Sequence, residues 1–199
     1  VTAGGNITDS DTVTVGGNLA ATTDDNNGVI DLGTLAVDGT IALVTHNNGA
    51  ATVVNDAGLN FAASTVGGAL TATATNGHIT QTGALDITGV TTIVAGTSKN
   101  ITLTTSTNDF KNDVLITSGN NVSLVDANAI DLGASTVSGT YAVTATTGTI
   151  TQSGALDIEG TTTLVTAEQG QAIVLGTATN AFTGAVTITT NDNSSPGPV

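Results

Sequence analysis

The segment ITQTGALDITG, residues 79–89, occurs a second time as ITQSGALDIEG at residues 150–160. Nine of the eleven positions are identical, at an offset of 71 residues. Self-similarity at a fixed period is typical of proteins that stack one structural unit on the next. We therefore interpret the repeat before any single motif.

The residues around the repeated segment alternate with a period of two. Apolar residues and threonines take turns at 70–75, 101–104 and 186–189. Clusters of Gly and Asn interrupt the alternation every few residues, and no long stretch has the 3.6-residue period of an amphipathic helix. This pattern predicts short β-strands joined by tight turns.

The repeat divides further into segments that each begin with an apolar residue followed by Thr or Ser. These segments run over 79–100, 101–121 and 122–149. About 22 residues is close to one turn of a β-solenoid, in which each turn buries its apolar face on the next. We predict about 8 rungs, grouped in 71–72-residue units of three rungs. Parallel crossovers are right-handed, so the predicted fold is all-β, a right-handed parallel β-helix.

The predicted solenoid is a single domain over residues 1–190, with repeats at 7–78, 79–149 and 150–190. A tail or linker rich in Pro, Ser and Gly follows at 191–199. One aliphatic ladder is expected from Ile79, Ile101, Val122, Ile150 and Ile173, with Leu103, Leu124 and Leu175 beside it. Phe110 and Phe182 are expected at equivalent places three rungs apart. A row of β-sandwiches is the competing fold, but a 71-residue unit without Trp is short for one.

Composition restricts both the core and the partners. The chain is 39% hydrophobic but has no Trp, Met or Cys and one Tyr, which suits a narrow aliphatic interior. Two Lys, no Arg and a net charge of −14 argue against nucleic acid and anionic membranes as partners. No apolar run approaches the ~18 residues of a spanning helix, so no membrane insertion is expected. We expect a mature, soluble, secreted segment without disulfides.

Three phrases carry a family resemblance: ITQSGALDI, STVSGTYAVTATTGTITQ and TTTLV. They resemble the shaft repeats of filamentous haemagglutinin-like exoproteins and giant autotransporter adhesins of Gram-negative bacteria, most clearly over 79–190. The resemblance implies a right-handed β-helix exported to the cell surface, and it supplies no catalytic residues. The Asn-Pro-Asn-Gly type motif of the family's secretion domain is missing from the sequence, so we expect a shaft segment.

Acidic turns are the candidate metal sites. Four aspartates could offer oxygen ligands to calcium: Asp9, Asp11, Asp24 and Asp25. Their spacing matches neither the EF-hand loop nor the calcium-binding nonapeptide of β-rolls, and solvated turns rich in Asx residues are the simpler interpretation. His46 and His78 lie in similar turns, where a solvent-facing role is the simpler one.

Two other functions remain open as alternatives. Some parallel β-helices act on polysaccharides, and stacked rungs could bring two carboxylates to catalytic distance, but bases and aromatic sugar platforms are scarce. Thr-x-Thr pairs such as 71–73 and 102–104 could bind ice, although ordinary β-propensity also explains them.

The sequence thus favours a structural and interaction role rather than an enzyme. We predict a segment of an extracellular bacterial fibre or surface adhesin, stacking end to end on flanking repeats or identical subunits. Host or matrix glycans and proteins are the other expected partners. No cofactor is predicted apart from the calcium alternative, which would make the chain a calcium-dependent matrix protein.

Overall fold

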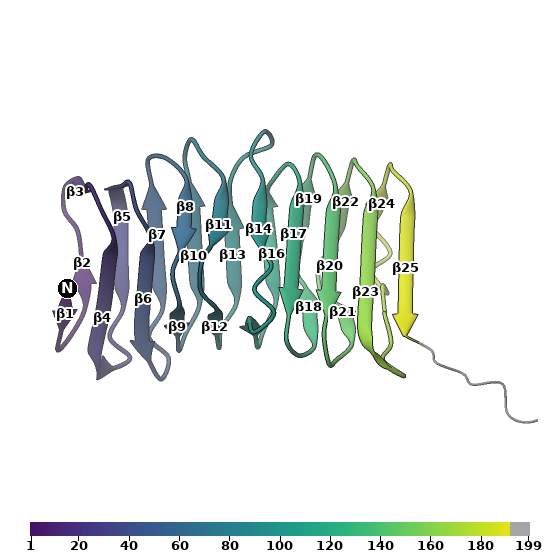
Figure 1. Cartoon of the computed structure of the whole chain (residues 1–199), viewed down its shortest axis with the longest axis horizontal. Helices are drawn as coiled ribbons and strands as arrows, with labels where there is room; N and C mark the ends of the chain where they lie inside the picture. The colour runs from purple at the N-terminus through teal and green to yellow at the C-terminus, as the bar shows by residue number, and fades with distance from the viewer. Residues whose placement is uncertain (192–199) are drawn as a thin grey trace, which may run out of the picture.

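A computed structural model describes residues 1–191 of the 199-residue chain. These residues form a β-solenoid of about 9 turns, with 25 strands and no helix (Figure 1). Neighbouring strands pair in parallel. Strands β17 to β25 on the viewer's side run downward while the chain advances to the right, so the coil is right-handed. The predicted parallel β-helix is confirmed, and the expected tail at 191–199 lies, except for Asn191, outside the described residues.

Three sheets contain the strands. The 13-stranded sheet, sheet A, contains β1 (Thr2–Ala3), β4 (Leu19–Asn26), β6 (Ile41–His46), β8 (Leu59–Phe61), β9 (Ser64–Val66), β11 (Ile79–Gln81), β12 (Leu85–Ile87), β14 (Ile101–Leu103), β15 (Asp109–Phe110), β17 (Val122–Asp126), β20 (Tyr141–Ala145), β23 (Thr162–Gln169) and β25 (Val186–Asn191). The nine-stranded sheet, sheet B, contains β2 (Ile7–Thr8), β3 (Val13–Val15), β5 (Ile30–Val37), β7 (Ala51–Asn55), β10 (Leu70–Ala74), β13 (Thr91–Val94), β16 (Val114–Ser118), β18 (Ile130–Leu132) and β21 (Ile150–Gln152). Sheet C contains β19 (Ser135–Val137), β22 (Leu156–Ile158) and β24 (Ala181–Phe182).

The core is a narrow aliphatic column between the sheets. Side chains alternate along each strand, so in β10 Leu70, Ala72 and Ala74 are buried while the two threonines between them are half-buried. Each inward residue packs on its counterpart one turn away, about 4.8 Å along the rod. Burial of one Leu or Ile stabilises the fold by about 1.5–3 kcal/mol, and the stacking repeats this gain at every turn. The few large side chains, Phe61, Phe110 and Tyr141, are also fully buried.

Each turn of the solenoid has two sides of different shape. In the middle of the rod, β7, β10, β13 and β16 are single strands that follow one another in sheet B. We call such a side straight. The opposite side is divided by a corner into two short strands, such as β11 and β12, and we call it bent. From β17 onward the roles are exchanged: β17, β20, β23 and β25 form the straight side in sheet A, and the bent side lies in sheets B and C.

The exchange follows from the number of sides in one 71-residue repeat. Between β7 and β17 the chain makes seven sides, namely β7, β8–β9, β10, β11–β12, β13, β14–β15 and β16. Seven is odd, so the next copy begins on the opposite sheet. One repeat therefore spans three and a half turns, and successive copies are related by half a turn about the rod axis. The repeat thus does not contain the predicted whole number of three rungs, and the rod has about 9 turns instead of 8.

The half turn also corrects the predicted ladders. Ile79, Ile101 and Val122 do stack, but the next partner of Val122 is Tyr141, only 19 residues away, followed by Thr162. Ile150 instead pairs with Ile130 and Ile173 in sheet B. The predicted 28-residue rung is therefore wrong. Leu103 and Leu124 are neighbours as predicted, but Leu175 belongs to the turn after Ile150 and lies outside their column. Phe110 and Phe182 occupy equivalent repeat positions on opposite sides of the rod.

Glycines stack where the chain enters a straight side. Gly139, Gly160 and Gly184 follow one another on successive turns, and each lies against the backbone of the one before. A Cβ atom on Gly160 would lie 2.2 Å from the carbonyl oxygen of Gly139, and one on Gly184 would lie 2.3 Å from that of Gly160. No real side chain tolerates such contacts, so this column keeps the turns at their close spacing.

Candidate functional site

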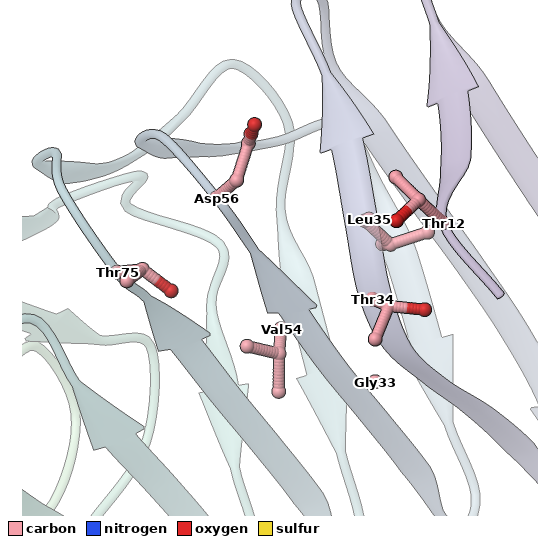
Figure 2. A pocket seen from close by; sticks show the side chains of 7 residues that line it. All are labelled: Thr12, Gly33, Thr34, Leu35, Val54, Asp56 and Thr75. Atoms are coloured by element: carbon pink, nitrogen blue, oxygen red, sulfur yellow. The ribbon is translucent and has the colours of Figure 1, made fainter.

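One hollow lies beside a corner of the solenoid near its first turns. It has a volume of about 260 Å³ and is lined by Thr12, Gly33, Thr34, Leu35, Val54, Asp56 and Thr75 (Figure 2). Its origin is a mismatch of shapes, because β5 bends between Leu32 and Leu35 whereas the next strand of the sheet, β7, is straight. Asp56 contributes the single carboxylate of the lining.

Two further hollows occupy equivalent positions in successive repeats. The first, of about 350 Å³, includes Leu59, Asn60 and Thr80, and the second, of about 160 Å³, includes their counterparts Ile130, Asp131 and Thr151 at an offset of 71. The half turn places them on opposite sides of the rod. Each has one carboxylate in its lining, Asp38 in the first and Asp131 in the second. Glycoside hydrolysis usually needs a pair of carboxyl groups across one cleft, and none of the three hollows has such a pair.

The aspartates that we singled out for calcium lie in two separate turns. Asp9 follows β2 and ties it to β5: its carboxylate accepts hydrogen bonds from Gly33 N (3.1 Å), Thr34 N (2.8 Å) and Thr34 Oγ1 (2.9 Å). Partial burial opposes ionisation, but these donors outweigh it and hold the pKa of Asp9 below its usual value. Asp11 is exposed at the same corner, where its carbonyl oxygen accepts from Thr34 Oγ1 (2.9 Å).

The other two candidates, Asp24 and Asp25, are exposed at the end of β4, where Asp25 O accepts from Gly28 N (3.3 Å). His46 ends β6, whereas His78 precedes β11 and accepts a hydrogen bond from Asn100 N at Nδ1 (2.8 Å). Within residues 1–191 no three His, Cys, Asp or Glu side chains gather in a group that could hold a metal ion. Calcium binding stays a prediction.

Buried polar residues, which were not among the predicted site residues, bridge the places where a side changes shape. Where straight β6 meets bent β8–β9, Ser64 Oγ accepts from Leu43 N (3.0 Å) and donates to Ala62 O (2.9 Å). Ser135 repeats both bonds one repeat later, to Ile116 N (3.2 Å) and Gly133 O (3.0 Å). At the corner the backbone ladder is interrupted, so the serine hydroxyl replaces the missing carbonyl partner.

Where a bent side is followed by a straight side on the next turn, the bridging residue is an amide in one repeat and an acid in the next. Asn55 accepts from Val37 N (2.9 Å) and donates to Val37 O (3.1 Å) and Gly58 O (2.7 Å). Its counterpart Asp126 accepts from Phe110 N (2.8 Å) and Asn128 N (2.6 Å). The Asp126 side chain is fully buried, and this desolvation raises its pKa to about 6 despite the two N–H donors.

A hydrogen-bonded pair of one glutamine and one asparagine holds each bent side together. Asn108 Oδ1 accepts from Gln81 Nε2 (2.8 Å) and Leu85 N (3.0 Å), and Asn108 Nδ2 returns a bond to Gln81 Oε1 (2.9 Å). Gln152 and Asn180 form the same pair in the next repeat. These contacts explain why Gln and Asn recur at fixed offsets in the sequence. In the sequence, the corresponding signal is an amide residue that recurs among apolar residues, as Gln81 and Gln152 do.

Charged residues are absent from the central outward columns of two straight sides. The side formed by β7, β10, β13 and β16 points these residues outward, in two columns: Thr52, Thr71, Thr92, Leu115 and Val54, Thr73, Val94, Ser118. The side formed by β17, β20, β23 and β25 presents Ser123, Ala142, Thr163, Thr187 and Val125, Thr144, Val165, Thr189. Neither set contains a charged residue. Of the acids on strands, Asp31, Asp86 and Asp157 lie on bent sides. Asp24 and Asp25 lie at the end of β4, and the exposed Glu168 lies near the end of β23, outside the columns given above.

Lys111 is the exception to the acidic character of the bent sides. Its Nζ atom lies 2.5 Å from Asp86 Oδ1 and 3.5 Å from Asp109 Oδ2. The two aspartates face each other on neighbouring strands, so the lysine relieves the repulsion of like charges. The hydrogen bond to Asp86 is the main cause that raises the pKa of Lys111.

A family model described as repeats of unknown function, DUF5649, matches residues 48–117 and 119–189. The chain belongs to this family. Each DUF5649 match begins just before the first strand of a straight side, which is β7 in one match and β17 in the other. It ends within the last strand of the same straight side, which is β16 or β25 respectively. The family repeat therefore coincides with the seven sides described above. No curated protein and no solved structure matched the chain. Within residues 1–191 of this DUF5649 protein, no helix has the length and apolar character to cross a membrane.

Proposed function

We propose that this chain is a structural and interaction segment of an extracellular bacterial fibre or surface adhesin, not an enzyme. The observation that carries the proposal is the stacking of successive DUF5649 repeats, in which each turn contacts only its neighbours. Adding repeats therefore lengthens such a rod without changing how its core packs. The rod acts as a spacer of fixed length and presents surfaces along that length.

The distribution of polar residues supports this proposal. The recurring Ser, Asn and Gln side chains form hydrogen bonds within the rod, many of them to the backbone. Each of the three hollows has only one carboxylate among its lining residues. The resemblance of ITQSGALDI and the related phrases to haemagglutinin-like shaft repeats points the same way, and with it to export and a cell-surface location. The partners that fit are flanking repeats or identical subunits end to end, and glycans or proteins of a host or matrix.

Immunogold electron microscopy of intact cells of the producing organism would test the proposal. An antibody against this chain is expected to label fibres that extend from the cell surface, without permeabilisation. Label found only after permeabilisation would overturn the extracellular assignment. Electron microscopy of the purified chain, with and without EDTA, would then show whether rods join end to end and whether a divalent cation holds the junction.

A further inference from the structure

We propose that the two uncharged straight sides are lateral contact surfaces on which a second copy of this chain docks, rod beside rod. This inference deepens the proposed structural role and rests on it for its biological meaning. The two surfaces are defined by the outward columns given above: the first on β7, β10, β13 and β16, and the second on β17, β20, β23 and β25.

The charge distribution selects these surfaces for contact between copies. With a net charge of −14, two identical chains repel each other over most approaches. An approach through a bent side would bring acids such as Asp31, Asp86 or Asp157 against their own copies. An approach through two straight sides removes only methyl and hydroxyl groups from water. Asp56 and Asp113 border the first surface, and Glu168 near the end of β23 borders the second, so each surface has an uncharged centre and a polar rim.

The shape of the surfaces also fits a second copy. Successive strands repeat at about 4.8 Å, and the outward columns of one rod have the same spacing as those of any other rod. Val54, Thr73 and Val94 on the first surface correspond to Val125, Thr144 and Val165 on the second. Valine and threonine have nearly the same shape, so their side chains can interdigitate between two flat sheets, as in dry sheet-to-sheet contacts.

The area predicts how strong the contact is. Four strands and two columns cover roughly 250 Å² on each partner, so one contact removes about 500 Å² in total. Stable complexes bury about 1,200–2,000 Å², so a single contact is weak and forms only at high protein concentration. Because the half turn places the two surfaces on opposite sides of the rod, each chain has two neighbours. Weak contacts then add along a fibre of many repeats.

Sedimentation equilibrium of the purified chain, up to about 1 mM, tests this proposal. We expect the average mass to rise with concentration, and to rise more at about 0.5 M than at about 0.02 M salt, because salt screens the repulsion of the acidic rods. The double variant Thr73→Glu/Thr144→Glu places a carboxylate in the centre of each surface and is expected to associate at least tenfold more weakly. The control Thr65→Glu/Thr136→Glu adds the same charge at exposed positions of the bent sides and should associate much more strongly than the first variant.

A cross-linking measurement does not depend on the strength of the contact. The chain has no cysteine, so Thr144→Cys creates a single thiol on the second surface and Thr136→Cys creates one on a bent side. We expect a short bismaleimide to form dimers several times faster from Thr144→Cys, either alone or mixed with Thr73→Cys, than from Thr136→Cys. Equal rates, or a wild-type chain that stays monomeric at both salt concentrations, would overturn the proposal. Binding of ice or of a glycan to the straight sides without self-association would overturn it too. The cell-surface test of the proposed function has a separate readout, so either idea can fail alone.

Discussion

Replacing Asp126 by Asn should stabilise the protein at neutral pH and destabilise it in acid. Burial raises the pKa of Asp126 to about 6 in the folded chain, against the ordinary value of 3.8. A difference of about two units corresponds to roughly 3 kcal/mol. The folded state holds this proton more tightly than the unfolded chain, so the stabilisation is present below pH 3.8 and is lost as the pH rises through 6.

The variant avoids this cost but loses one hydrogen bond. An Asn at position 126 can accept from Phe110 N through its Oδ1 atom, as Asn55 accepts from Val37 N. Its amide nitrogen cannot accept from Asn128 N, which loses about 1 kcal/mol. We therefore expect Asp126→Asn to be more stable than wild type by about 2 kcal/mol at pH 7, and less stable by about 0.5 kcal/mol at pH 4.

Urea unfolding of both proteins at pH 4, 5, 6 and 7 measures this difference. Repulsion among the other acids is common to both and cancels in the comparison. Asn55→Asp is the matched control: it introduces the acid at the equivalent position and should create the pH dependence that Asp126→Asn removes. Parallel curves for wild type and Asp126→Asn would refute the reasoning, because they would mean that the ionised carboxylate is not penalised by its burial.

Three further predictions concern single contacts. Gly160→Ala should cost about 3 kcal/mol or more in urea unfolding, because its Cβ would press on a backbone carbonyl, whereas Gly176→Ala, with open space around it, should cost less than about 1 kcal/mol. Ser135→Ala leaves a buried N–H without a partner and should cost about 1–3 kcal/mol, and a similar loss for the exposed Ser153→Ala would contradict that role. Lys111→Ala should change stability by less than about 1 kcal/mol at 0.15 M salt, since its ion pairs are exposed; a larger loss would show a packing role.

The solenoid itself could be predicted from the sequence because its causes are local. Alternation of apolar residues and threonine determines which side chains point inward, and clusters of Gly and Asn mark the turns. The offset between residues 79–89 and 150–160 then indicates that one unit is stacked on another. These signals do not depend on which strand lies beside which.

The ladders could not be predicted because they depend on a count of sides. Aligning Ile150 with Ile79 assumes that equal motifs occupy equal columns, and seven sides per repeat make this false. The true neighbour of Val122 is Tyr141, whereas an aliphatic residue was expected there. The aromatic residue therefore did not stand out in the sequence as a member of the ladder. The uncharged straight sides were missed for the same reason. Thr73 and Thr144 become members of equivalent surfaces only when the columns are known.

The bridging residues were hidden by a different limit. Ser64, Asn55 and Gln81 are not of a residue type or spacing that predicts a site, and their importance comes from the hydrogen bonds they make beside a corner. The calcium candidates show the opposite case, in which the residue type predicts a site but the structure gives the residue another role. Asp9 has the residue type of a ligand, yet the structure uses both carboxylate oxygens to join β2 to the next turn.

The half turn gives the number of repeats a parity. Inserting or deleting one 71-residue repeat lengthens or shortens the rod by about 17 Å and also swings everything beyond it to the other side. Two repeats restore the original orientation. A gene that gains or loses repeats by recombination would therefore change reach in small steps, but would keep a distal binding surface in the same direction only when repeats change in pairs.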